Sequence, residues 1–235
     1  MWFWFSLVTL LFWSGSDLFG KLGCRDNDDK LGHLKMVCSV GLVMGVHAVI
    51  SLITGSAVIS LDIIITYLPV SLLYIVSMAF SYMAFRYIEL SISSPICNSS
   101  GAIVAILVLV TEGIGEDLSP LALLAVICVC VGVVLLGFVE AHEDEDLRRA
   151  RQDVSNYRYA KSPLAFILPI IYCILDALGT FADSKVLETL DEDSANCAYE
   201  LTFLAAGIVC FIIIKIKNKG QKFETVPKRN LYRLL

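Results

Sequence analysis

The segment ITYLPVSLLYIVSMAFSYMAF covers Ile65–Phe85 and decides the fold, because its 21 residues include no charged side chain. An α-helix rises about 1.5 Å per residue, so about 20 apolar residues cross the ~30 Å hydrocarbon core of a bilayer. The segment is therefore predicted to be a transmembrane helix. The rest of the chain extends this pattern in both directions.

Six further segments have a similar length and an apolar composition. Charges between Ile63 and Val139 are confined to the expected connections and helix ends, at Arg86, Glu89, Glu112, Glu116 and Asp117. The chain is predicted to be an all-α, polytopic membrane helical bundle. Its seven transmembrane helices are expected over residues 2–22, 34–53, 65–85, 92–111, 121–139, 163–185 and 198–214.

The composition supports a membrane protein. Of the 235 residues, 57 % are hydrophobic and 17 % are charged, whereas a soluble domain has roughly 25 % charged residues. The mean hydropathy is +0.75, so the apolar surface exceeds what one globular core can bury. The lipid bilayer is therefore the expected partner, and the expected location is the plasma membrane, as a multi-pass protein. A net charge of -5 without a clustered basic face argues against nucleic acid as a partner.

The sequence contains no pattern typical of an enzyme or a cofactor site. Its eight cysteines form no CxxC pair and have no histidine at metal-ligand spacing, so we interpret them as small apolar side chains packed between helices. No nucleotide-binding loop and no nucleophile–base pair occurs. We therefore expect no catalytic residues, no metal and no cofactor.

Basic residues are distributed unevenly among the connections. They lie in the loops after the first, third and fifth expected helices, the last of these being the charged linker 140–162, and in the tail 218–235. Lys185, at a helix end, is the exception on the opposite side. By the positive-inside rule, the basic loops and the tail face the cytoplasm and the N-terminus faces outward.

An internal repeat relates the two ends of the chain. A shift of 164 residues places Gly15 on Gly179 and Lys21 on Lys185, and lays the first two expected helices on the last two. Because the copies are an odd number of helices apart, the second enters the membrane from the opposite side. Such an inverted repeat is typical of secondary transporters. The sequence thus predicts a five-helix repeat over 1–139 and the first two helices of a second over 163–217, in a bundle that would need ten helices to close.

Several motifs follow one another in an order typical of one family. Trp13 and Gly15 lie late in the first helix, and YMAFRYIELSISSP (Tyr82–Pro95) joins the third helix to the fourth. LVLVTE (Leu107–Glu112) ends the fourth helix, and GVVLLG (Gly132–Gly137) ends the fifth. In this order and spacing the chain resembles the EamA-like branch of the drug/metabolite transporter superfamily.

The resemblance implies two five-helix repeats and secondary transport of a small-molecule solute by alternating access, with a proton or the solute gradient as the energy source. It also implies that both termini lie in the cytoplasm, opposite to the N-terminal orientation that the loop charges predict. Two other functions stay open at this point. Seven helices are also typical of a membrane receptor or sensor, and a membrane assembly partner, including one that self-associates, needs no solute pathway.

Polar residues inside the expected helices are candidates for a solute pathway, because an ionisable side chain there costs about 2.5–3.5 kcal/mol on insertion scales. Asp176 lies roughly 20 Å along its helix, and Gly179 follows on the same face, where a solute or a neighbouring helix could approach. Asp176 is a candidate for substrate or proton handling, or for a structural hydrogen bond between helices. The pathway candidates are Trp13, Ser14, Asp17, His47, Tyr82, Asn98, Ser99, Asp176 and Gly179.

A second set of charges lies near the helix ends. Asp17 and Lys21 have the i,i+4 spacing of an ion pair in the favourable order, and Asp183 and Lys185 are expected to form an interfacial pair. The resemblance implies that the fourth helix lines the central cavity and that its final glutamate matches an acidic residue of the family. The gate or interfacial candidates are Lys21, Glu112, Asp183 and Lys185.

Overall fold

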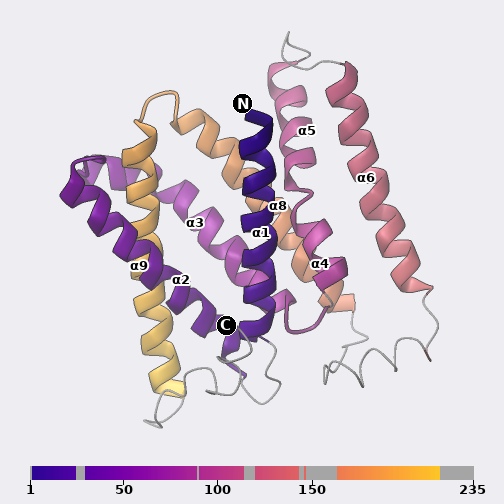
Figure 1. Cartoon of the computed structure of the whole chain (residues 1–235), viewed down its shortest axis with the longest axis horizontal. Coiled ribbons are helices and arrows are strands. Elements are labelled where there is room, and N and C mark those ends of the chain that lie inside the picture. The colour runs from indigo at the N-terminus through magenta and orange to yellow at the C-terminus, as the bar shows by residue number, and fades with distance from the viewer. Residues whose placement is uncertain are drawn as a thin grey trace.

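The computed structural model describes residues 2–24, 30–88, 90–113, 120–142, 146 and 163–217. Within them the regular secondary structure is helical, which confirms the predicted all-α bundle (Figure 1). The predicted tail 218–235 and most of the predicted linker 140–162 lie outside the described residues. The helices are α1 (Trp2–Cys24), α2 (Gly32–Thr54), α3 (Leu61–Ala84), α4 (Leu90–Cys97), α5 (Ser100–Glu112), α6 (Pro120–Ala141), α8 (Pro163–Val186) and α9 (Glu192–Lys217).

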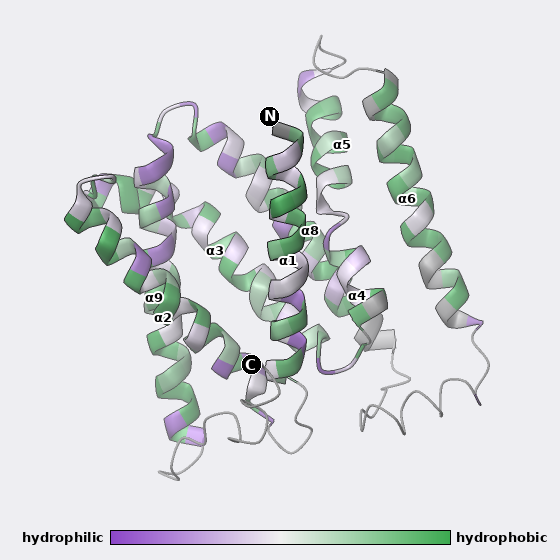
Figure 2. Ribbon diagram, in the orientation of Figure 1, coloured by the Kyte–Doolittle hydropathy of each residue, from purple (hydrophilic) through white to green (hydrophobic). Residues whose placement is uncertain are grey.

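Five described segments are long and apolar enough to cross a membrane. They are α2, α3, the stretch Ile92–Glu112 that α4 and α5 form together, the stretch Ile167–Val186 of α8, and α9. α1 and α6 have similar lengths, 23 and 22 residues. Large apolar side chains are exposed, as at Leu11 and Val110, which are 72 % and 77 % exposed. Figure 2 shows that hydrophobic residues run along most of the helices. Such surfaces are stable where lipid tails surround them, because the tails are as apolar as the side chains.

The predicted span over 92–111 is confirmed as one membrane-crossing stretch, Ile92–Glu112, but Asn98 and Ser99 interrupt it and separate α4 from α5. Pro95 lies inside α4, where it lacks an amide hydrogen to donate to the preceding turn. The Asn98 side chain donates to the carbonyl oxygen of Ser94 at 2.9 Å, and the Ser99 amide donates to that of Ile96 at 3.2 Å. These local hydrogen bonds compete with the helical pattern and account for the break.

α2 and α9 pack together and run antiparallel. The Cys38 thiol lies 3.2 Å from the carbonyl oxygen of Gly207, and the Cys197 thiol lies 4.0 Å from that of Ala48. α3 packs against both α9 and α8. In Figure 1, α2, α3 and α9 occupy one side of the molecule and α5 and α6 the other, while α1 stands between them at the front and α8 runs behind α1 toward α4.

Gly41 sets the spacing between α2 and α9. A Cβ atom added at Gly41 would lie 2.7 Å from the carbonyl oxygen of Phe203, and Phe203 is fully buried. In membranes, small residues at helix contacts allow backbones to approach closely, and the attraction between helices depends on this packing. The absence of a side chain at Gly41 is therefore a requirement of the α2–α9 contact.

Replacing Gly41 by alanine should destabilise the bundle, because the added methyl group meets the rigid backbone of α9. We expect the free energy of unfolding to fall by about 1–3 kcal/mol, the usual cost of overpacking. Gly15→Ala is the matched control, since a Cβ there has nothing within 4 Å and both substitutions favour a helix equally. Thermal unfolding in detergent compares the two variants, and equal stability would contradict the close packing of α2 on α9.

Candidate functional site

A polar network joins α1 to the break between α4 and α5. Asp17 Oδ2 accepts hydrogen bonds from the Ser94 hydroxyl and from the Asn98 amide, the latter at 3.2 Å. The Asn98 amide also lies 3.1 Å from Ser94 Oγ. Asn98 is exposed, so the network is reached from outside α4. Two predicted pathway residues, Asp17 and Asn98, thus come together at the break.

Asp176 approaches the same break from α8. The hydroxyls of Ser100 and Tyr172 are the neighbouring polar groups that stabilise its carboxylate. Ser99 Oγ lies 3.3 Å from Cys173 Sγ, also on α8. The predicted residues Ser99 and Asp176 are therefore both at the contact between α8 and the start of α5.

The two carboxylates have common neighbours between them. The side chains of Cys97 and Tyr172, both buried, lie within electrostatic range of Asp17 and of Asp176. Tyr82, 6 % exposed, is also within range of Asp17. Two carboxylates around a helix break can bind a proton, a cation or a solute that donates hydrogen bonds, because each of these compensates a charge that the bilayer does not solvate.

Three predicted pathway residues have other surroundings. Trp13 is 46 % exposed on α1, and the Ser14 hydroxyl donates to the carbonyl oxygen of Leu10 in its own helix at 2.8 Å. Gly179 faces α3, where an added Cβ would lie 3.2 Å from two atoms of the Tyr74 ring. Either a solute or a neighbouring helix was expected at Gly179, and the structure places the helix α3 there.

His47 has a partner that the sequence analysis missed. Its Nδ1 lies 2.7 Å from Oε1 of Glu200 on α9. The Glu200 side chain is 13 % exposed and that of His47 is 67 % exposed. The pair belongs to the contact between α2 and α9, and Figure 1 shows these two helices on the other side of α1 from α5 and α6.

Lys21 is anchored to the connection between α3 and α4. Its ammonium group donates to the carbonyl oxygens of Phe85 and Ile88, each at 2.5 Å. The predicted ion pair with Asp17 is thus replaced by contacts to main-chain oxygens, while Asp17 turns toward α4. The side chain of Lys21 therefore fixes the connection that immediately precedes α4.

The C-terminal end of α8 carries the other predicted gate charges. Lys185 Nζ lies 2.7 Å from Oε1 of Glu112, at the end of α5, and 3.0 Å from Oε1 of Glu188. Asp183 accepts a hydrogen bond from the Tyr67 hydroxyl at 2.5 Å, in place of the predicted pair with Lys185. Two gate candidates, Glu112 and Lys185, therefore join α5 to α8 at the edge of the bundle.

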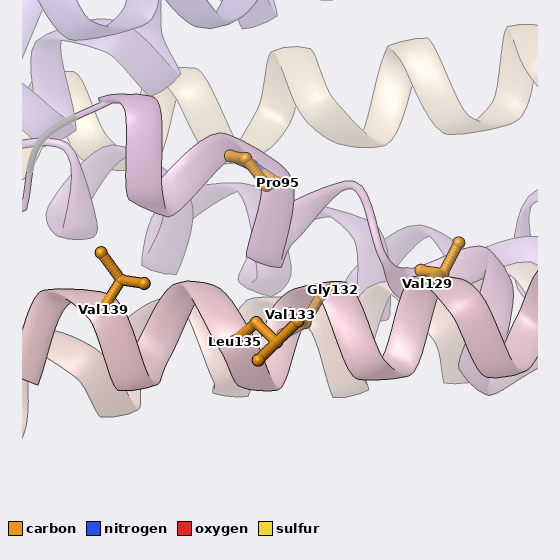
Figure 3. A pocket seen from close by; sticks show the side chains of 6 residues that line it. All are labelled: Pro95, Val129, Gly132, Val133, Leu135 and Val139. Carbon is orange, nitrogen blue, oxygen red and sulfur yellow. The ribbon is translucent and has the colours of Figure 1, made fainter.

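An apolar groove lies beside the break, between α4 and α6, and Figure 3 shows the side chains that line it. Its volume is about 510 Å³. An added Cβ at Gly132 would have nothing within 4 Å, so the space in front of this glycine is open. The lining residues are Pro95, Val129, Gly132, Val133, Leu135 and Val139.

No family model, no curated protein and no solved structure matches this chain. The site is therefore interpreted from its geometry. Within the described residues, no group of three His, Cys, Asp or Glu side chains is placed to hold a metal ion. Carboxylates, hydroxyls, thiols and one amide are the groups with which this site can act on a ligand.

Several residues of the site were not predicted, although the sequence carries a signal for some of them. Ser94 precedes Asn98 by four residues and Tyr172 precedes Asp176 by four, so each pair shares a helix face. Glu200 is an acidic residue inside an apolar helix, the same signal that indicated Asp176. The pairing of Ser99 with Cys173 has no such signal, because it depends on how α5 meets α8.

Replacing Tyr67 by phenylalanine removes the hydroxyl that donates to Asp183 and leaves the ring in place. We expect the free energy of unfolding to fall by about 1.5–3 kcal/mol, the usual contribution of a hydrogen bond to a charged group. Tyr87→Phe, at a side chain 38 % exposed, is the control. Thermal unfolding of both variants in detergent tests this, and a Tyr67→Phe variant as stable as the wild type would show that the hydrogen bond is unimportant.

Proposed function

We propose that the chain is a secondary transporter of small metabolites in the plasma membrane, of the EamA-like type in the drug/metabolite transporter superfamily. In this proposal a solute binds at the break between α4 and α5, and alternating access exposes it to each side of the membrane in turn. The observation that carries the proposal is the interruption of a transmembrane segment between two carboxylates, Asp17 and Asp176.

The position of the break supports this function. Asn98 lies eight residues from the start of α4 and fourteen from the end of α5, which corresponds to roughly 12 and 21 Å of helix. The break therefore lies well inside the hydrocarbon core. Irregular backbone at this depth is tolerated where it is buried in protein or lines a cavity, and broken helices form the solute sites of many secondary transporters.

The position of Asp176 gives further support. It lies thirteen residues after the start of α8 and ten before its end, so roughly 15–20 Å of helix separate it from either surface. A carboxylate at this depth needs a compensating partner, and the described partners are hydroxyl groups. We propose that the remaining compensation comes from a proton or from the solute, which makes Asp176 the group that couples the two.

The contacts among the other helices agree with an inverted repeat. α2 and α9 correspond to each other under the 164-residue shift, and they cross antiparallel, as an inverted relation requires. The Glu112–Lys185 ion pair lies where α5 meets α8. Both side chains are nearly half exposed, so the pair can separate at little cost, which suits a gate that opens and closes.

Reconstitution into liposomes tests the proposal. Uptake is measured for pools of amino acids, amines, sugars and nucleosides, with and without an imposed pH gradient. Asp176→Asn keeps the size of the side chain and removes its charge, so we expect uptake to fall at least tenfold and its response to the pH gradient to disappear. Asp62→Asn is the control, because Asp62 is an exposed acid in the first turn of α3, and its uptake should equal that of the wild type.

Two outcomes would contradict this function. The first is the absence of uptake of every pool by correctly folded wild-type protein. The second is uptake by Asp176→Asn that equals the wild-type value at every pH. Thermal unfolding of both variants in detergent shows that a loss of uptake is not a loss of folding.

A further inference from the structure

We infer that the site selects amphipathic organic cations, with the cationic group at Asp17 and Asn98 and the apolar part in the groove between α4 and α6. This inference rests on the proposed transport function and adds the chemical class of the solute. It is carried by the position of an apolar groove next to a carboxylate that is only partly compensated.

The hydrogen bonds of Asp17 leave one side of its carboxylate open. The Ser94 hydroxyl and the Asn98 amide both donate to the same oxygen, Oδ2. Within the described residues, no hydrogen bond reaches Oδ1. The nearest lysine along α1, Lys21, donates to the carbonyl oxygens of Phe85 and Ile88. A carboxylate held in this way offers an acceptor oxygen to an ammonium or similar group, and the attraction is strong where water is scarce.

The groove begins next to this network. Pro95, which lines the groove, precedes Asn98 by three residues, so the two lie on neighbouring parts of the α4 surface about 4.5 Å apart along the axis. The exposed Asn98 side chain lies 3.2 Å from Asp17 Oδ2, so it connects this part of the α4 surface to the carboxylate. In the inferred complex, the cationic end lies at Asp17 and the apolar body extends past Pro95 into the groove.

The lining of the groove determines what the apolar part can be. Its six lining residues have no polar side chain, so a water molecule there would lack the two or more polar partners that hold buried water. Burial of an aliphatic or aromatic group is favourable in such a space. An anionic solute would instead be repelled by Asp17, and a neutral solute would leave its charge uncompensated.

A set of four small probes separates the contributions of charge and apolar body. They are 4-phenylbutylammonium, 4-phenylbutanol, 4-phenylbutyrate and methylammonium, and binding is measured by calorimetry on the full chain in lipid nanodiscs, with empty nanodiscs subtracted. We expect 4-phenylbutylammonium to bind at least tenfold more tightly than each of the other three. Since this comparison uses the wild-type protein, it does not depend on the folding of any variant.

Two substitutions then locate the parts of the binding site. Asp17→Asn should weaken binding of 4-phenylbutylammonium at least tenfold, and Asp17→Glu should restore most of it. Gly132→Leu, which fills the groove, should weaken binding of this probe about fivefold to tenfold while Gly132→Ala has a smaller effect. The controls are Asp62→Asn for the charge and Val134→Leu for the groove, because Val134 is 71 % exposed on α6 and does not line it.

Equal binding of the cation and the alcohol would overturn the inference, since the groove would then be a site for hydrocarbon alone. Tighter binding of the anion, or binding of the cation that neither Asp17→Asn nor Gly132→Leu changes, would also overturn it. These results are independent of the uptake measurement. A chain that transports another class of solute would fail the binding test and pass the transport test, whereas a chain that binds the cation without uptake would do the reverse.

Discussion

The hydrocarbon core of a bilayer offers no hydrogen-bonding partners, and this constraint governs where each polar side chain of the chain can lie. Single hydroxyls meet it locally: those of Ser14, Thr54 and Thr111 each donate to a carbonyl oxygen one turn earlier in the same helix. A carboxylate cannot be compensated in this way because it has no proton to donate. Asp17 and Asp176 therefore depend on other helices, and both find their partners around the break between α4 and α5.

The packing divides the described helices into a tight part and a loose part. α2, α3, α8 and α9 approach one another closely, through Gly41 against Phe203 and Gly179 against Tyr74. α6 contacts the rest through α4 and α5, and an apolar groove lies beside its contact with α4. The break lies at the boundary of the two parts. This arrangement suits a protein in which one group of helices moves against another, as alternating access requires.

The sequence predicts the helices well because length and apolar composition suffice for them, and five of the seven predicted spans correspond to described segments long and apolar enough to cross a membrane. It also indicates Asp17, Asn98, Ser99 and Asp176 as polar residues inside helices, and these four meet at one place. What it does not predict is partner choice. The expected ion pair of Asp17 with Lys21 is a local, one-helix pattern, and contacts to α4 and to the α3–α4 connection prevail over it because they compensate more polar groups. The break is also not predicted, because it accompanies local hydrogen bonds of Asn98 and Ser99 that a hydropathy pattern does not contain.

The central claim is that the break forms a solute site that water can reach inside the membrane. Its most direct test is the labelling of Asn98→Cys by a water-soluble, membrane-impermeant thiol reagent, in a chain whose eight native cysteines are replaced by alanine. Val134→Cys, inside α6 (Pro120–Ala141) and 71 % exposed, is the comparison. The account predicts that the cysteine at position 98 reacts from at least one side of the membrane and that the one at position 134 does not. Failure of position 98 to react from either side, in a correctly folded protein, would contradict it.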